Sequence, residues 1–265
     1  MCGKDDGANL FDGDAPVLRA LGVLCDAALE ALSPTRCAGC ERPGELICGD
    51  CLTRLDLIDP ATACTHCGAP FGSLVCTECT PATGEPHVLR TSAIGRVLAV
   101  AVFDGPMPRI VRAYKDAGEQ RLAPLFADML LDAAVHAQAS AEDRYGGLLD
   151  DADALIFVPA TASAYRRRGF DHMGAIASAL ARSAGIPLVD ALVKHGSSDQ
   201  RLLGRADRKL QAQGAYEVVE DVRGARILLI DDVITTGSTV AAAADALARA
   251  GACHVDALAL ARVLS

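Results

Sequence analysis

The chain has 265 residues, a formal net charge of −9 at pH 7 and a 51% share of hydrophobic residues. That length allows one mid-sized α/β domain and a second, small one. The acidic charge argues against broad nonspecific affinity for nucleic acid, although it leaves room for a local basic groove. No run of apolar residues reaches the eighteen or so that cross a bilayer, so the sequence predicts no contact with a membrane.

The first 86 residues precede the α/β part of the chain. Residues 1–14 are acidic and polar, which predicts a disordered N-terminus without a secretory leader and therefore a cytoplasmic protein. Apolar side chains then recur at helical spacing between residues 15 and 32, and the pattern ends at Ser33-Pro34. Residues 15–86 are thus predicted to contain a helix followed by a cysteine-rich module.

Eight of the eleven cysteines form four Cys-x-x-Cys pairs between residues 37 and 79. Two such pairs can surround one zinc ion with four thiolates, and this arrangement leaves no open position for catalysis. We therefore predict two structural zinc ions, each held by two consecutive pairs. The predicted ligands are Cys37, Cys40, Cys48, Cys51, Cys64, Cys67, Cys76 and Cys79.

The spacing leaves alternatives to this arrangement. It equally permits a crossed arrangement in which alternate pairs share an ion, and His66 is a possible replacement ligand. Redox dithiols or an iron–sulfur cluster are other uses of such pairs. Four regular pairs without a thioredoxin-like βαβ pattern around them favour zinc over both.

From residue 91 onward, predicted strands alternate with predicted helices, which indicates an α/β fold with a parallel sheet and right-handed crossovers. A core of Val, Leu, Ile and Ala suits helices packed on such a sheet. The predicted domain spans residues 91–265. Its strands are expected at Ala93–Phe103, Ala154–Val158, Leu188–Val193, Tyr216–Val219, Arg226–Ile230 and Val255–Ala261, and its helices at Pro108–Asp116, Leu122–Ala139, Met173–Ala184 and Ser238–Ala250.

A hydroxyl-rich loop follows the strand Arg226–Ile230 and leads into a helix. Ligands of parallel α/β sheets bind beyond the carboxyl ends of the strands. Hydroxyls and backbone N–H groups at a helix N-terminus make an anion cradle, and a glycine lets the chain curl closely around a phosphate. The loop consists of Thr235, Thr236, Gly237, Ser238 and Thr239.

The acidic pair Asp231-Asp232 stands between that strand and the loop. Two carboxylates would repel a bare polyphosphate, so they make sense if they face hydroxyls or a magnesium ion. The alternative is that they only end a strand and that Ser238 or Thr239 caps a helix. A cap needs neither two carboxylates nor a loop of hydroxyls. The sequence contains no Walker-type loop and no Gly-x-Gly-x-x-Gly motif.

The string ILLIDDVITTGST closely resembles the signature of type I phosphoribosyltransferases, which bind 5-phosphoribosyl-1-diphosphate (PRPP). The resemblance implies a type I phosphoribosyltransferase-like parallel sheet flanked by helices. It also implies that Asp231 and Asp232 contact the ribose hydroxyls and that residues 235–239 hold the 5-phosphate.

Other segments are similar to one subfamily, the ComF (ComFC/GntX-like) proteins associated with DNA uptake. Val158-Pro159 and a later Arg-Gly-Phe resemble the family's VP…RGFNQ segment, with Asp171-His172 where the family usually has Asn-Gln. Tyr114-Lys115 resembles a short Lys-centred segment. The remaining matches are Gln200, Leu203, Arg208 and Gly214-Ala215-Tyr216, with Gln211 at a usual Asn position.

The resemblance also implies how the diphosphate leaving group is held. Such a group needs cations and magnesium around it. Lys115 and Arg208 are candidates, with Arg208 on a predicted lid at residues 196–214. Backbone groups near Thr161 are candidate donors, and His172 and His195 are expected at the surface or in packing roles. The other candidate cations are Arg166, Arg167 and Arg168, for which a solvated charged turn is the alternative.

The predicted function is transfer of a phosphoribosyl group from PRPP, with magnesium, to an acceptor that the sequence does not identify, and with a link to DNA uptake. The alternative is a non-catalytic competence or nucleic-acid-handling protein that binds single-stranded DNA or a competence protein. Phe71 is the cysteine module's one aromatic residue, which weakens the case for base stacking. The sequence leaves the oligomeric state open.

Overall fold

The computed structural model describes residues 34–72, 76–79, 87–194 and 215–264. The chain divides into two compact units, Met1–Cys48 and Gly49–Ser265. The predictions for residues 1–14, the helix at 15–32, Arg208, His195 and the lid at 196–214 lie outside the described residues. The predicted domain boundaries at 86 and 91 stay predictions.

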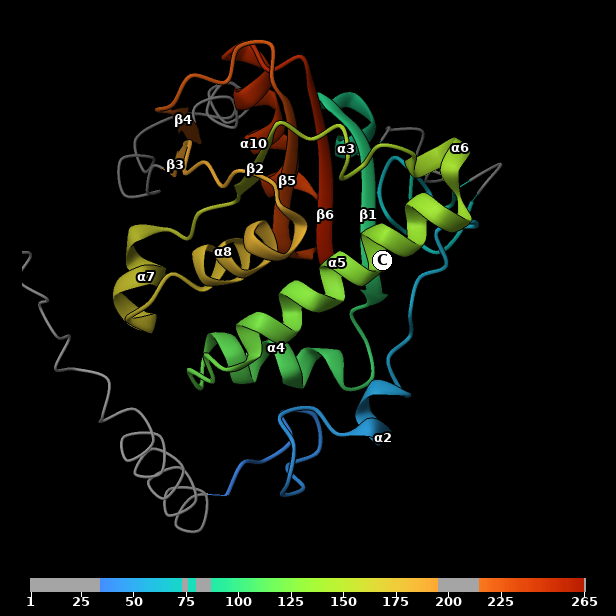
Figure 1. Cartoon of the computed structure of the whole chain (residues 1–265), viewed down its shortest axis with the longest axis vertical. Helices are drawn as coiled ribbons and strands as arrows, with labels where there is room; N and C mark the ends of the chain where they lie inside the picture. Colours follow the sequence, from blue (N-terminus) through green and yellow to red (C-terminus); the bar gives the residue numbers. More distant parts are fainter. Residues whose placement is uncertain (1–33, 73–75, 80–86, 195–214, 265) are drawn as a thin grey trace, which may run out of the picture. The chain divides into compact units, whose positions relative to one another are not determined.

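A four-stranded parallel sheet forms the centre of the second unit (Figure 1). The strand order is β1-β6-β5-β2, and all three neighbouring pairs are parallel. This arrangement confirms the predicted parallel sheet. The strands are β1 (Ile94–Val102), β2 (Ala154–Phe157), β5 (Arg226–Ile234) and β6 (His254–Arg262).

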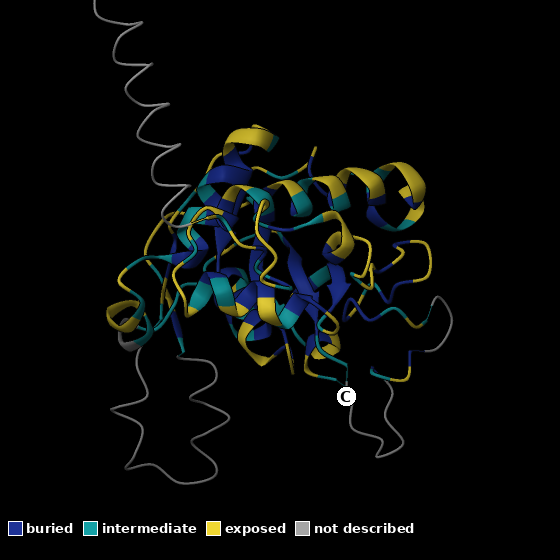
Figure 2. Ribbon diagram, turned by 90° about the horizontal axis from the view of Figure 1, so that it is seen from below, coloured by how far each residue is buried: buried dark blue, intermediate teal, exposed yellow. Residues whose placement is uncertain are grey.

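The sheet is buried on both faces, which explains why its strands have continuous apolar sequences and no alternation. In β5, residues Ile227–Ile230 are all at most 2% exposed. Figure 2 shows the same contrast, with buried strands inside and helices whose outer surfaces are exposed. Helices α5 (Leu122–Ser140) and α8 (His172–Ala184) pack against each other and against one face of the sheet. Helix α10 (Ser238–Arg249) lies behind the sheet in Figure 1.

Two predicted strands do not join the main sheet. Strands β3 (Leu192–Lys194) and β4 (Tyr216–Val218) pair antiparallel as a separate two-stranded sheet. The strand predicted at Leu188–Val193 is therefore displaced, and Leu188 makes only an isolated bridge to Leu155 of β2. Its residues alternate in burial and form a half-exposed ribbon, unlike the continuous burial of β5.

The remaining helices lie at the ends of the strands. Helix α7 was not predicted: Thr161 caps its N-terminus, and Gly169 ends it in the left-handed region with φ 77°. No helix among the described residues is long and apolar enough to cross a membrane. These helices are α2 (Gly49–Leu52), α3 (Val88–Thr91), α4 (Met107–Lys115), α6 (Glu142–Tyr145) and α7 (Ala162–Arg168).

Candidate functional site

The acidic pair lies at the carboxyl end of β5, where the neighbouring strand stops. Strand β2 pairs with β5 only as far as Phe157 opposite Ile230. Asp231 and Asp232 therefore continue β5 beyond its neighbour, at the edge where ligands of parallel sheets bind. They are only 9% and 6% exposed. Adjacent residues of a strand point to opposite faces of the sheet, so the two carboxylates face different surroundings.

Asp232 is enclosed by two cationic or hydrogen-bonding groups. Its Oδ2 lies 2.5 Å from Lys115 Nζ, at the end of α4, and 3.1 Å from His172 Nε2, at the start of α8. Burial alone would raise the pKa of the Asp232 carboxyl, but the bond to His172 and the charge of Lys115 outweigh burial and hold it below its usual range. Asp232 is therefore ionised at neutral pH.

Asp231 has the opposite electrostatic character. Burial, and then the adjacent negative charge of Asp232, raise the pKa of Asp231 to about 8, against smaller lowering effects of Lys115 and Lys194. The pair thus holds one carboxylate and one carboxyl group at neutral pH. Environments that separate two neighbouring pKa values in this way are typical of functional sites, although structural networks produce them too.

His172 lies beside the acidic pair and is buried, so of its two expected roles, surface or packing, the surface role is wrong. The side chain is 5% exposed. Arg168 Nη1 lies 3.2 Å from Nδ1 and 3.4 Å from Nε2 of the ring. Nε2 lies 3.1 Å from Asp232 Oδ2, and an ionised carboxylate can only accept, so Nε2 carries the proton that is donated to Asp232. The sequence did contain a signal for this role: His172 stands where the resembled family usually has glutamine. A glutamine amide is also a hydrogen-bond donor of suitable length, so a donor was to be expected at this position.

Tyr114 fixes the position of His172 from the helix that carries Lys115. Its hydroxyl donates to the backbone carbonyl of His172 at 2.5 Å, and its ring packs edge-on against Phe126 and Phe170. Both residues of the predicted Tyr114-Lys115 segment therefore lie at the site, but only Lys115 contacts the acidic pair. The charge contact is direct, and the tyrosine acts through the backbone of His172.

The loop after β5 has the form of an open anion cradle. Thr235, Thr236 and Ser238 are exposed, and Gly237 adopts φ 76° immediately before α10. A Cβ atom on Gly237 would lie 2.6 Å from the side chain of Leu89, so both the conformation and the space require glycine here. The N–H of Ser238, the first residue of α10, donates to the Thr236 hydroxyl at 3.4 Å. The next N–H groups at a helix N-terminus have no acceptor within the helix, as anion binding requires.

A cavity of about 460 Å³ opens beside this loop. Besides Thr235, Thr236 and Ser238, its walls include His87 and Arg262. Burial and the charge of Arg262 lower the pKa of His87. Neither residue was predicted, because both lie outside the segments that resemble a known motif. Arg262 did carry one signal: it is a cation at the end of an otherwise apolar strand.

The other predicted cations lie on α7. Arg166 and Arg167 are exposed, whereas Arg168 is half-buried against His172. The Thr161 hydroxyl accepts from Ala164 N–H at 3.2 Å, so that side chain is engaged as a helix cap. The structure thus brings Lys115, Arg168 and the acidic pair together, and roles in diphosphate binding for the predicted cations stay predictions.

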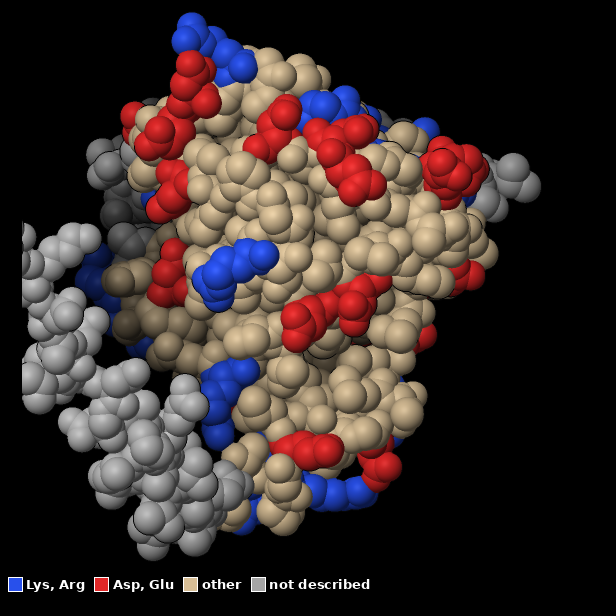
Figure 3. Space-filling model, viewed as in Figure 1, with Lys and Arg blue, Asp and Glu red and all other residues tan. Residues whose placement is uncertain are grey.

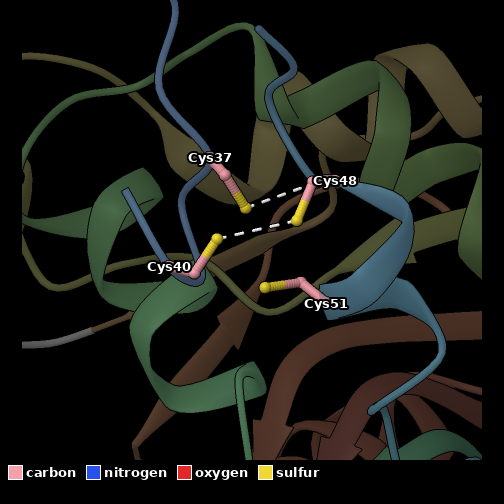
Figure 4. A group of neighbouring side chains, drawn as sticks. All are labelled: Cys37, Cys40, Cys48 and Cys51. Carbon is pink, nitrogen blue, oxygen red and sulfur yellow. Dashed lines mark hydrogen bonds between the residues drawn. The ribbon is translucent and has the colours of Figure 1, made fainter. Parts of the chain in front are cut away.

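The first cysteine cluster consists of Cys37, Cys40, Cys48 and Cys51, whose sulfurs all lie within 4.8 Å of one another (Figure 4). Cys40 Sγ is 3.6 Å from Cys48 Sγ. A disulfide would need about 2.05 Å, whereas four zinc–sulfur bonds of about 2.3 Å in a tetrahedron place the sulfurs ~3.8 Å apart. The donor set fits zinc. Backbone N–H groups, Cys48 first, overcome the effect of burial and lower the pKa of Cys37 to about 6.

The second cluster consists of Cys64, Cys67, Cys76 and Cys79. The sulfur distances are 3.7 Å for both Cys64–Cys79 and Cys67–Cys76, which fits zinc equally well. Both clusters combine consecutive pairs, as predicted first, and neither has the crossed arrangement. Hydrogen bonds from Cys67 and Cys79 lower the pKa of Cys64 strongly, which favours a thiolate in this buried cluster.

Basic and acidic side chains are interspersed on the molecular face in Figure 3, over a mainly neutral surface. No continuous basic stripe of described residues appears on that face. A phosphate backbone would need such a stripe for strong nonspecific binding.

Comparison with known proteins adds three findings. The family model described as "Phosphoribosyl transferase domain" matches residues 167–265. The "DNA utilization protein YhgH" of Escherichia coli (strain K12) is 28% identical over 241 residues, 87% of this chain and 98% of that protein. An "Adenine phosphoribosyltransferase" of Mycobacterium avium is 34% identical over 151 residues, 57% of this chain and 72% of that protein.

Among solved structures, the chain matches one titled "Structure of the allosteric regulatory enzyme of purine biosynthesis" at 26% sequence identity. The match covers 53% of this chain and 25% of that one, with a TM-score of 0.33.

Proposed function

The chain belongs to the phosphoribosyltransferase domain family, in its ComF-like branch, and on that premise we propose that it binds PRPP and transfers the phosphoribosyl group to an acceptor. The observation that carries the proposal is the acidic pair at the end of β5 followed by an open, hydroxyl-lined loop. A ribose 5-phosphate needs acceptors for its hydroxyls and donors for its phosphate. The rim of the sheet offers both.

In the proposed reaction, the bond between C1 of the ribose and the diphosphate breaks, and its electron pair leaves with the diphosphate. A nucleophilic atom of the acceptor then bonds to C1. Lys115 and the arginines of α7 would balance the charge of the leaving group. Asp232, kept ionised by Lys115 and His172, would accept from a ribose hydroxyl.

Magnesium would arrive with the diphosphate. Among the described residues, the two cysteine clusters are the sole groups of three or more metal-binding side chains. Magnesium is usually held by one or two carboxylates together with substrate phosphates. Asp231 is the candidate ligand here, because Oδ2 of Asp232 already has two partners, and its carboxyl group would lose its proton when the ion binds. The ion would supply charge neutralisation at the leaving group.

The test is thermal unfolding with PRPP and magnesium. We expect PRPP to raise the melting temperature of the wild type, since a ligand that binds only the folded state stabilises it. The double variant Asp231→Asn/Asp232→Asn should show no such rise. Asp221→Asn is the matched control, because Asp221 pairs with Arg223 on the surface and its loss should leave the response intact. A wild type that PRPP does not stabilise would contradict the proposal.

A second candidate function rests on the name of the relatives, "DNA utilization protein". It is a non-catalytic role in which the same scaffold binds single-stranded DNA or a protein partner. A gel shift with single-stranded DNA over a range of salt concentrations separates the two candidates, because phosphate contacts weaken steeply as salt rises. Salt-dependent binding together with no response to PRPP would favour the second candidate.

A further inference from the structure

Arg262 is a buried cation that joins two distant segments of the Gly49–Ser265 unit. It is the last residue of β6, and its side chain is only 2% exposed. A buried guanidinium is unfavourable unless its N–H groups find acceptors. The acceptors of Arg262 come from the phosphate loop on one side and from the second cysteine cluster on the other, together with the adjacent Val263 carbonyl and the His87 ring.

On the side of the phosphate loop, Nη1 donates to the backbone carbonyls of Thr235 at 2.5 Å and of Ile234 at 3.3 Å. Thr235 is the first residue of the hydroxyl-rich loop. Two carbonyls bound to one nitrogen define the path by which the chain leaves β5 and turns toward Gly237.

On the side of the cysteine cluster, Nε donates to the backbone carbonyl of Cys67 at 3.0 Å. Nη2 lies 3.6 Å from Oε2 of Glu78, a carboxylate whose side chain is 7% exposed. Cys67 is a candidate metal ligand, and Glu78 stands between the candidate ligands Cys76 and Cys79. Both acceptors therefore belong to residues of the segment that a metal ion in this cluster would hold.

We propose that Arg262 is a positioning residue, which holds the phosphate loop in its binding conformation through the second cysteine cluster. The guanidinium is planar and its donors are fixed relative to one another, so a change on one side alters the geometry available to the other. Metal in the second cluster and phosphate in the loop are then thermodynamically linked, and the linkage is reciprocal. The identity of the phosphate ligand rests on the proposed function; the link between cluster and loop does not.

The chain contains a matched control for this link. Arg96 of β1 pairs with Asp256 of β6 at 2.5 Å, and Asp256 is 4% exposed. Arg96 also donates to the carbonyl of Gly146 at 2.8 Å. This second buried ion pair also involves β6, but among the described residues no hydrogen bond runs directly from either side chain to the phosphate loop or to a cysteine of a cluster. Its loss should destabilise the fold without affecting the loop selectively.

The primary experiment is amide hydrogen exchange of residues 235–241 in the zinc-loaded protein without PRPP. We expect about tenfold faster exchange there in Arg262→Lys and a smaller increase in Glu78→Gln, because both weaken the hold on the loop. Asp256→Asn should leave these amides unchanged. Glu78→Gln keeps the guanidinium, so it serves if Arg262→Lys does not fold. Zinc content should remain at two ions per chain in Glu78→Gln.

The second experiment uses calorimetry with PRPP and magnesium. Glu78→Gln should bind PRPP about tenfold more weakly than Asp256→Asn, and bound PRPP should slow the release of zinc from the second cluster in the wild type. If exchange in residues 235–241 is the same in Glu78→Gln and Asp256→Asn, the link is refuted. If exchange differs but the wild type does not bind PRPP, the link stands and the proposed function fails.

Discussion

The two cysteine clusters have the same sequence pattern and different structural surroundings. In the first, Cys40 and Cys48 are partly exposed, and the backbone hydrogen bonds around the cluster are local, such as Cys37 to Arg42 and Ala38 to Leu46. In the second, all four cysteines are at most 6% exposed. They pack in one apolar cluster with Leu89, with Val97 of β1 and with residues of α10.

The backbone hydrogen bonds of the two clusters differ as well. Val97 N–H of β1 donates to the carbonyl of Thr65 at 2.7 Å, inside the third Cys-x-x-Cys pair, and Arg262 of β6 donates to Cys67. The same cysteine spacing can therefore form one metal site whose loss affects only nearby residues and another whose loss destabilises the core of a domain.

The largest expected effect concerns stability. Cys67→Ser removes a ligand from the buried cluster, so it should lower the unfolding free energy of the main unit by several kcal/mol, as expected when a buried structural metal site is lost. Cys40→Ser should leave the main thermal transition nearly unchanged. Each variant should retain about one zinc ion per chain by atomic emission. Equal losses of stability would show that the two clusters do not differ in this way.

A second prediction leaves both clusters intact and changes the acidic pair. The pKa of Asp231 is raised on folding, so its contribution to stability is complete at pH below about 4 and is lost progressively as the pH rises toward about 8. The unfolding free energy of Asp231→Asn relative to wild type should therefore increase by up to ~1.4 kcal/mol per pH unit across that range. Denaturant titrations from pH 5 to pH 8 measure it, and zinc content should not change. A pH-independent difference would contradict the raised pKa.

A third prediction concerns His172, which connects α8 to the acidic pair. His172→Ala should weaken PRPP binding by roughly tenfold, because a buried carboxylate loses one hydrogen bond worth about 1–3 kcal/mol. His172→Gln should retain most of the affinity, since its amide can donate to Asp232. Calorimetry at fixed magnesium distinguishes the two variants. Similar losses in both would argue that the imidazole itself is needed.

The smallest effect is kinetic. Cys253 is exposed and belongs to neither cluster, so it should react with a thiol reagent before the cysteines of either cluster in native protein. The first cluster should follow as its zinc is released, and the second should react last because its thiols are buried. A chromophoric zinc indicator records the two releases together with the thiol count. Simultaneous release of both zinc ions would contradict the predicted difference in reaction rate between the two clusters.

Much of the fold could be predicted from the sequence, because Ala154–Phe157 and residues 257–261 are continuous apolar runs and the acidic pair ends a third. The displaced strand near Leu188 could not be predicted, since a short half-exposed ribbon has no strong period. His172 and Arg262 were missed for another reason. Their roles depend on partners that are 60 and at least 27 residues away in sequence, and no local pattern records such contacts.

The central claim is that the end of β5 and the loop at residues 235–239 form a PRPP site. Isothermal titration calorimetry of the zinc-loaded wild type with PRPP and magnesium tests it most directly. The account predicts saturable binding of one PRPP per chain that is lost in Asp231→Asn/Asp232→Asn and retained in Asp221→Asn. Absence of heat in the wild type, or equal binding by the double variant, would contradict it.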